Sequence, residues 1–309
     1  LSPNVTYGGM ACAADLVLCG CGNNLSNTAV ANSALYIANW AREKGQPCVI
    51  SISLGDNQGP HDGTSETAEW YDSIAEEYGA VILLAAGNEG ECKFYASKTL
   101  SSDDDYLGTI LGLSPDNEEE DEHATTLSSV DIWNSTNDPL EVQFVVVDED
   151  GEKVWESDKM SSGSINAATL RTYFNNTGFQ SYWKVPQEVK VQSSSTNSNG
   201  RFNLYVEANL GPAKTEGNKF GMLVYGKSGN TIHMWNAPYD ASFETTASST
   251  YNFVAGDASA SICDDVTGKH TISVGAWCSR LDVPFDYGQE VGSLSNAPFK
   301  QDDIASFSS

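Results

Sequence analysis

Between residues 14 and 85, three short apolar runs alternate with two stretches of helical periodicity. The apolar runs are Ala14–Cys19, Cys48–Leu54 and Ala80–Ala85. Apolar residues recur at helical spacing from Ser26 or Asn27 to about Lys44, and again from Thr64 or Ser65 to Tyr78. Each stretch ends at a glycine, a common helix terminator. This alternation predicts three parallel strands joined by two crossover helices.

The turns that follow the three apolar runs are expected to share one edge of the sheet, where open α/β sheets bind their ligands. These turns are Gly20-Cys21-Gly22, Ser53-Leu54-Gly55 and Gly87-Asn88-Glu89. Asn88 is the most informative residue among them, because an asparagine amide at a strand end can donate a hydrogen bond to a developing oxyanion. From the local sequence alone, Asn88 is better explained as a turn residue that tolerates left-handed backbone.

After about Lys93 the sequence changes to short apolar or alternating segments separated by turn residues. The segments are Thr126–Trp133, Glu141–Val147, Lys153–Glu156, Gln187–Gln192, Phe202–Glu207, Gly221–Tyr225 and Thr231–Trp235. Many short strands with few helix signals favour an antiparallel sandwich or jelly roll. Ser249–Gly256 and Thr271–Ala276 then resemble core strands of the first part.

The predicted fold class is therefore α/β, a parallel sheet with flanking helices that an all-β insertion interrupts. We expect residues 1–92 to form the first part of the α/β domain and residues 93–246 to form the inserted β-sandwich. Residues 247–309 are expected to continue the α/β domain.

The charge of the chain limits its partners. A formal net charge of -26 argues against nucleic acid and anionic membrane surfaces as partners. No apolar run reaches the roughly 18 to 20 residues of a transmembrane helix. The acidic balance leaves two interpretations open, a solvated surface and a preference for basic substrates.

No cofactor is expected from the distribution of possible ligands. The seven cysteines form no paired CxxC spacing, which argues against a zinc site or a disulfide framework. The acidic runs Asp103–Asp105 and Glu118–Glu122 lack the alternating spacing of a calcium loop, so we interpret them as solvated charge. His123, His233 and His270 are scattered without ligand spacing.

Five segments resemble subtilisin-like serine proteases (subtilases) and occur in the order of that family. They are Gly9–Val17, Val49–Gly55, Ala85–Gly90, His270–Ala276 and Asp303–Ser309. The segment Gly59–Ser65 further resembles the bacterial branch that includes clostridial spore-germination proteases and Bacteroidetes enzymes. Members of that branch carry a jelly-roll insertion in the catalytic domain. The resemblance implies a subtilisin-like parallel sheet and is compatible with an extracytoplasmic location.

The resemblance also implies roles for individual residues. Asn88 corresponds to the oxyanion-hole donor, and Ser53, Leu54 and Gly55 to an edge that pairs with the substrate backbone. Gly20, Cys21 and Gly22 correspond to the opposing edge. Ala85, Ala86, Gly87 and Glu89 correspond to the pocket for the side chain before the scissile bond, where the Glu89 carboxylate favours a basic residue.

The family motifs for the catalytic Asp, His and Ser have no match between Leu1 and Ser309. The resemblance therefore implies an internal fragment of a serine endopeptidase that acts on peptide or protein substrates and is inactive by itself. His61, Asp62 and Ser65 form an alternative triad in sequence only, and we interpret Ser65 as a helix N-cap instead.

Two alternatives to a protease fragment stay open. One is a non-catalytic pseudoprotease or scaffold. The other is a binding module in the β insertion, where Trp133, Tyr182, Trp183 and Trp235 would form a carbohydrate-stacking platform. We prefer core or inter-domain packing for these aromatic residues.

Overall fold

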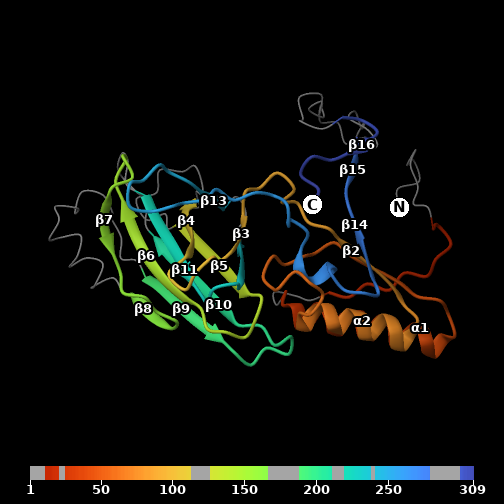
Figure 1. Cartoon of the computed structure of the whole chain (residues 1–309). Coiled ribbons are helices and arrows are strands. Elements are labelled where there is room, and N and C mark those ends of the chain that lie inside the picture. Colours follow the sequence, from red (N-terminus) through yellow and green to blue (C-terminus); the bar gives the residue numbers. More distant parts are fainter. Residues whose placement is uncertain are drawn as a thin grey trace.

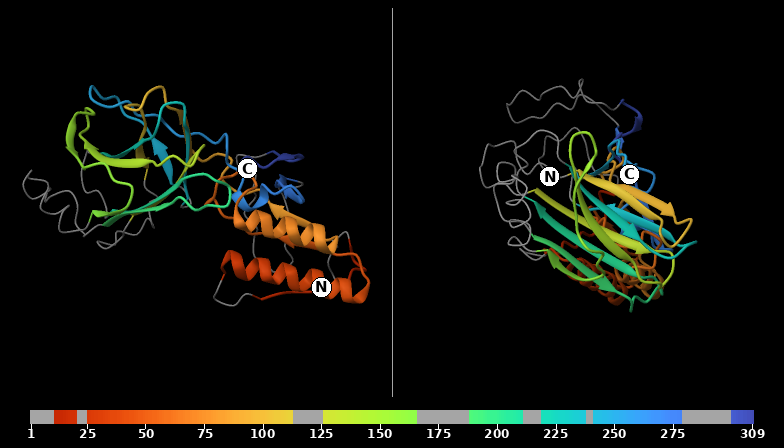
Figure 2. Two further views of the ribbon diagram at one scale, coloured as in Figure 1. Left: turned by 60° about the horizontal axis from the view of Figure 1, so that its bottom comes forward. Right: turned by 60° about the vertical axis from the view of Figure 1, so that its left-hand side comes forward.

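The computed structural model describes residues 11–20, 25–112, 126–165, 188–210, 219–237, 241–278 and 300–309. Figure 1 shows an antiparallel β-sandwich on one side and, on the other, two helices beside a small parallel sheet. The left view in Figure 2 shows the sandwich and the pair of helices side by side.

Both predicted helices are present and begin and end at the expected residues. Helix α1 (Asn27–Lys44) begins after Ser26, whose Oγ accepts a hydrogen bond from the Ala29 N–H at 3.3 Å. Helix α2 (Glu66–Tyr78) is capped in the same way by Ser65. Each helix ends at a left-handed glycine, Gly45 or Gly79, as is common at helix C-termini.

The parallel sheet contains β1 (Val49–Ile52), β2 (Val81–Ala85) and β14 (Thr271–Val274), in the order β1-β2-β14. One face of β1 and β2 is buried against the helices through Ile50, Ile52, Ile82 and Leu84. On the opposite face, apolar side chains of all three strands are exposed, among them Val49, Val81 and Ile272. Among the described residues, helices therefore cover one face of this sheet only.

Two antiparallel sheets form the sandwich. The six-stranded sheet has the order β3-β12-β5-β10-β9-β8. Its strands are β3 (Tyr95–Thr99), β12 (Thr231–Asn236), β5 (Thr126–Asn134), β10 (Asn203–Leu210), β9 (Glu188–Ser194) and β8 (Gly163–Ile165). The five-stranded sheet has the order β13-β4-β11-β6-β7. Its strands are β13 (Ser242–Glu244), β4 (Tyr106–Gly112), β11 (Lys219–Tyr225), β6 (Glu141–Val147) and β7 (Lys153–Glu156).

The inner faces of the two sheets enclose the largest core. Its fully buried side chains include Val130, Phe144, Leu204, Met222 and Ile232. Beyond the sandwich, a short 3-10 turn η2 (Asp264–Val266) precedes β14, and β15 (Trp277–Cys278) pairs with β16 (Asp303–Ile304).

The predicted fold class is wrong for the chain as a whole. Strands hold 36% of the described residues and helices 15%, and most strands belong to antiparallel sheets. The sequence analysis gave most weight to the strand–helix alternation at the start of the chain. That alternation produces a parallel sheet of only three described strands, whereas the sandwich strands pair with antiparallel neighbours.

Two predicted strands are also wrong. Residues 14–19 contain no strand, and the side chains of Leu16 and Leu18 are 83% and 89% exposed. Residues 249–256 contain no strand either. They pack on the five-stranded sheet instead, where the Val254 N–H donates to the Gly108 carbonyl at 2.9 Å. The domain boundaries at residues 92/93 and 246/247 stay predictions.

Among the described residues, none of the helices is long and apolar enough to cross a membrane. This agrees with the expectation from the sequence.

Candidate functional site

The turns that follow β1 and β2 meet at the side chain of Cys263. A Cβ placed on Gly55 would lie 2.6 Å from the Cys263 Sγ, and one placed on Gly87 would lie 2.9 Å from the same atom. The Cys263 N–H also donates to the Ala86 carbonyl at 2.9 Å. The predicted convergence of the Ser53–Gly55 and Ala85–Glu89 turns is therefore mediated by a third segment, which the sequence analysis did not identify.

Asn88 lies at the exposed tip of the turn after β2. Its backbone N–H donates to the Glu89 Oε2 at 2.7 Å. Its side-chain amide makes no hydrogen bond to any residue that the structure describes. The amide is thus available to a ligand at this edge of the sheet.

Residues 307–309 pack against the same turn. The Ser309 N–H donates to the Gly87 carbonyl at 3.2 Å, and the Ser309 Oγ accepts from the Glu89 N–H at 3.1 Å. The Gly90 N–H donates to the Phe307 carbonyl at 2.9 Å. These contacts fix the backbone of the Asn88 turn on the side of Gly87, Glu89 and Gly90.

The site is acidic. Burial is the main cause that raises the pKa of the Cys263 thiol to about 12, and the carboxylates of Glu89, Asp265 and Asp56 raise it further. A thiol with so high a pKa stays protonated and is a poor nucleophile. Burial also raises the pKa of Asp265 to about 7, with smaller contributions from the neighbouring Asp264 and Asp56 carboxylates.

The loop after β1 is held between the two parts of the molecule. The Gly59 N–H donates to the Asp131 Oδ2 on strand β5 at 2.7 Å, and the His61 N–H donates to the Asp264 Oδ1 at 2.7 Å. Burial raises the pKa of Asp131 to about 6, although the hydrogen bonds from Trp133, Asn203 and Gly59 favour its ionised form. These carboxylates connect the edge of the parallel sheet to the sandwich.

His61, Asp62 and Ser65 do not form a triad. The ring of His61 stacks on Trp235 with centroids 4.1 Å apart, and its two nitrogens lie next to backbone carbonyl oxygens. Asp62 pairs with the Arg201 Nη1 at 2.6 Å. Ser65 caps α2, so the N-cap interpretation is confirmed.

Trp133 and Trp235 are buried, and Trp235 stacks on His61 of the loop after β1, which leaves no exposed platform at these two residues. The packing interpretation is confirmed for this pair, whereas Tyr182 and Trp183 lie outside the described residues.

Three other predicted features can be placed. His233 hydrogen-bonds through Nδ1 with the Tyr95 hydroxyl at 2.8 Å. The Asp105 carboxylate accepts hydrogen bonds from Lys98 and Ser101. The run Glu118–Glu122 and His123 lie outside the described residues.

The predicted opposing edge is only partly described. Gly20 is exposed, with no described atom within 4 Å of a Cβ built on it. Cys21 and Gly22 lie outside the described residues. The structure therefore does not bring Gly20 against the Gly55 and Gly87 turns.

Comparisons with solved structures show a likeness in fold. The fold is similar to that of the CspB protease of Clostridium perfringens, with a TM-score of 0.55 and 17% sequence identity. The match covers 92% of this chain and 49% of the clostridial chain, so the chain spans about half the length of that protein. No family model matches the sequence, and no curated protein matches it. At 17% identity the likeness shows the fold alone, and the similar fold is that of a protease.

Proposed function

We propose that this chain is part of a serine endopeptidase in which Asn88 donates its side-chain amide to the oxyanion of the tetrahedral intermediate. The observation that carries the proposal is the exposed Asn88 amide, which bonds none of the described residues, on a turn that packing fixes on its other sides. A preorganised donor of this kind stabilises the transition state without reorganisation during the reaction.

The five ordered segments that resemble subtilases support the proposal, as does the fold likeness to a protease. The general base and the nucleophile are expected from polypeptide other than residues 1–309, because the family motifs for the triad have no match here. The chain by itself is then inactive.

The carboxylates around the turn suggest the preferred substrate. Glu89, Asp56 and Asp265 all lie near enough to the Cys263 thiol to raise its pKa. A substrate side chain that enters between the Gly55 and Gly87 turns meets this negative potential. We therefore expect a preference for lysine or arginine before the scissile bond, with the half-buried Glu89 as one contributor.

The test uses the longer protein encoded by the parent reading frame, assayed on fluorogenic peptides. Asn88→Ala is expected to lower kcat about a hundredfold to a thousandfold with little change in KM, since the lost bond forms only in the transition state. Asn32→Ala, which removes an exposed asparagine of α1, serves as the matched control. Unchanged kcat in Asn88→Ala would contradict the oxyanion role.

A second measurement addresses the isolated chain. Residues 1–309 are incubated with a serine-reactive fluorophosphonate, and no specific labelling is expected. Labelling that competes with substrate would show a nucleophile within this chain and overturn the fragment hypothesis.

A further inference from the structure

His61 lies in the middle of the loop after β1 and takes no part in the proposed reaction. Its backbone has a φ of 51°, in the left-handed region that favours glycine. Among the described residues other than glycine, only Asp302 also has a positive φ. A strained backbone of this kind persists where the surrounding contacts require it, and such positions cluster at functional sites. The contacts of the His61 side chain therefore need a physical account.

The ring of His61 is held against the sandwich. It stacks on Trp235 of β12, with the ring planes 8° apart and the centroids 4.1 Å apart. Trp235 is itself buried and donates through Nε1 to the Ala260 carbonyl at 3.0 Å, so its position is fixed. The backbone N–H of His61 donates to the Asp264 Oδ1 at 2.7 Å. The sandwich and the segment before β14 thus determine where the ring lies.

Both ring nitrogens of His61 lie next to oxygens that can only accept hydrogen bonds. The Nδ1 atom is 2.8 Å from the Ile262 carbonyl oxygen, and the Nε2 atom is 3.1 Å from the Asn57 carbonyl oxygen. A neutral imidazole carries one N–H and can donate to only one of these oxygens, whereas the doubly protonated ring donates to both. The arrangement is complete only when both nitrogens carry a proton.

The two carbonyls belong to two segments of the candidate site. Asn57 follows the Ser53–Gly55 edge by two residues. Ile262 precedes Cys263, the residue at which the turns after β1 and β2 meet. The His61 ring therefore joins the loop after β1 to the segment that lies under both turns.

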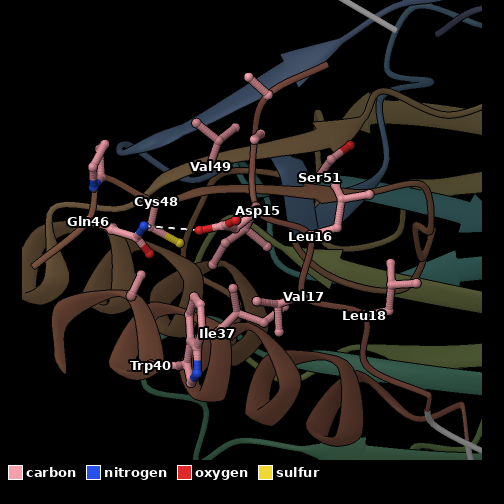
Figure 3. Close-up of a pocket in the computed structure, with 15 residues that line it drawn as sticks. Asp15, Leu16, Val17, Leu18, Ile37, Trp40, Gln46, Cys48, Val49 and Ser51 are labelled. Carbon is pink, nitrogen blue, oxygen red and sulfur yellow. Dashed lines mark hydrogen bonds between the residues drawn. The ribbon is translucent and has the colours of Figure 1, made fainter. Parts of the chain in front are cut away.

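Sheet pairing does not reach the end of β1, so the loop decides where that end lies. Figure 3 shows the beginning of β1 beside Ile37 and Trp40 of α1, which pack in the core of this part. Pairing with β2 stops at Ile52, and residues 53–55 beyond it are exposed. The position of these three residues depends on the loop that His61 helps to hold.

We propose that His61, with both ring nitrogens protonated, is a positioning residue that fixes the Ser53–Gly55 edge for the backbone of an extended peptide substrate, an inference that rests on the proposed function. The residue acts through the Asn57 and Ile262 carbonyls and touches neither the substrate nor the oxyanion. Loss of one ring proton leaves one of these carbonyls without its donor. The edge is then less firmly held at higher pH.

Other titratable and charged groups face the ring from the elements packed around it. They are Asp264 and Asp265 of η2, Asp131 of β5, Tyr95 of β3, His233 of β12 and, in the loop itself, Asp56 and Asp62, which pairs with Arg201. All of them are retained when His61 alone is replaced. Comparing a His61 variant with the unchanged protein therefore separates the effect of His61 from theirs.

The test uses the longer protein and two fluorogenic substrates with lysine before the scissile bond, a single-residue amide and a tetrapeptide amide. His61→Asn is the variant, because asparagine tolerates a left-handed backbone but has no ring to stack on Trp235 or to reach both carbonyls. It is expected to raise KM about tenfold for the tetrapeptide and less than about twofold for the single-residue amide, with kcat little changed, since the lost binding is equal in the ground and transition states.

His270→Asn is the matched control, because His270 is an exposed histidine outside the loop. It should leave KM unchanged for both substrates. In the unchanged protein and in His270→Asn, KM for the tetrapeptide should rise between about pH 5 and 8, the range in which histidine changes charge. The rise should be smaller in His61→Asn. The pH dependence of the unchanged protein needs no variant, so it also tests the proposal if His61→Asn fails to fold.

Hydrogen exchange of residues 1–309 gives a measurement that does not depend on catalysis. Peptides covering residues 53–60 are expected to exchange at least about fivefold faster in His61→Asn, with α1 unchanged as the internal reference. Unchanged exchange in residues 53–60 would overturn the proposal, as would equal KM changes for the two substrates or a KM for the tetrapeptide that is constant with pH. Faster exchange together with an unchanged kcat in Asn88→Ala would contradict the proposed function and still support the fixing of the edge by His61.

Discussion

Gly87 and Cys263 lie so close that a Cβ on Gly87 would come within 2.9 Å of the Cys263 Sγ. Gly87 also has a φ of 122°, in the region that L side chains rarely adopt. The contact places a residue from far along the chain directly under the Asn88 turn. It gives the turn after β2 two separate reasons to require glycine.

The two reasons can be separated by comparing Gly87 with Gly55, which meets the same sulfur without a left-handed backbone. Gly55→Ala and Gly87→Ala are each expected to lower the free energy of unfolding by about 1 to 3 kcal/mol. Combining each substitution with Cys263→Ala should restore most of the stability lost in Gly55→Ala. It should restore little of the stability lost in Gly87→Ala, because the backbone strain remains there. Urea unfolding of the four variants measures this, and Gly20→Ala, in open space, is the control.

Ser65→Ala tests the N-cap. Because the Ser65 Oγ accepts from the Ala68 N–H at 3.2 Å, its removal is expected to cost about 1 kcal/mol of stability. Ser73→Ala, which removes an exposed serine hydroxyl within the same helix, should cost less. In the longer protein, Ser65→Ala should leave kcat unchanged. A loss of kcat comparable to that of Asn88→Ala would revive a catalytic role for Ser65.

Stability is expected to fall as pH rises from about 4 to about 7. Asp265 has a folded-state pKa of about 7, above the unfolded value of about 3.9. The folded chain keeps this proton after the unfolded chain has lost it. The contribution is therefore fully present below the unfolded pKa and is lost as pH rises through the folded pKa. The raised pKa of Asp131 acts in the same direction.

Chemical unfolding at several pH values checks this expectation. Asp265→Asn should reduce the fall in the free energy of unfolding between pH 4 and 7 by on the order of a few kcal/mol. Asp303→Asn, at an exposed carboxylate, should leave the dependence unchanged. A pH dependence that is the same in Asp265→Asn and in the unchanged chain would exclude this origin.

Arg201→Met tests the junction between the sandwich and the helical part. The Arg201 guanidinium pairs with Asp62 at 2.6 Å and donates through Nε to the Asn134 carbonyl at 2.8 Å. Losing these bonds at a largely buried side chain is expected to cost about 1 to 3 kcal/mol. Lys153→Met, which breaks an exposed pair with Glu156, should cost less than about 1 kcal/mol. Thermal unfolding compares the two variants. Equally small losses of stability in both would show that the Arg201 bonds do not stabilise the junction.

Local chemistry in the sequence was enough to predict the helices. Ser26 and Ser65 as caps, and Gly45 and Gly79 as terminators, act within one turn of the chain, so their effect can be inferred from neighbouring residues. The sandwich strands Glu141–Val147 and Lys153–Glu156 were likewise predicted at their observed bounds, because each has its own apolar pattern and turn.

The fold class and the strand at residues 14–19 were predicted wrongly for a common reason. An apolar run becomes a strand only when another strand pairs with it, and pairing is a long-range property that the run does not encode. Leu16 and Leu18 have a strand-like pattern but no paired strand among the described residues, so they stay exposed.

The sequence by itself determined the capped helices, most strands of the sandwich and the position of Asn88 at a strand end, since these depend on residues close together in the chain. Only the tertiary structure decided that Cys263 lies under the Asn88 turn and that Asp131 and Asp264 hold the loop after β1. Those relationships join segments far apart in the chain, and burial, backbone pairing and charge act on them only after the chain has folded.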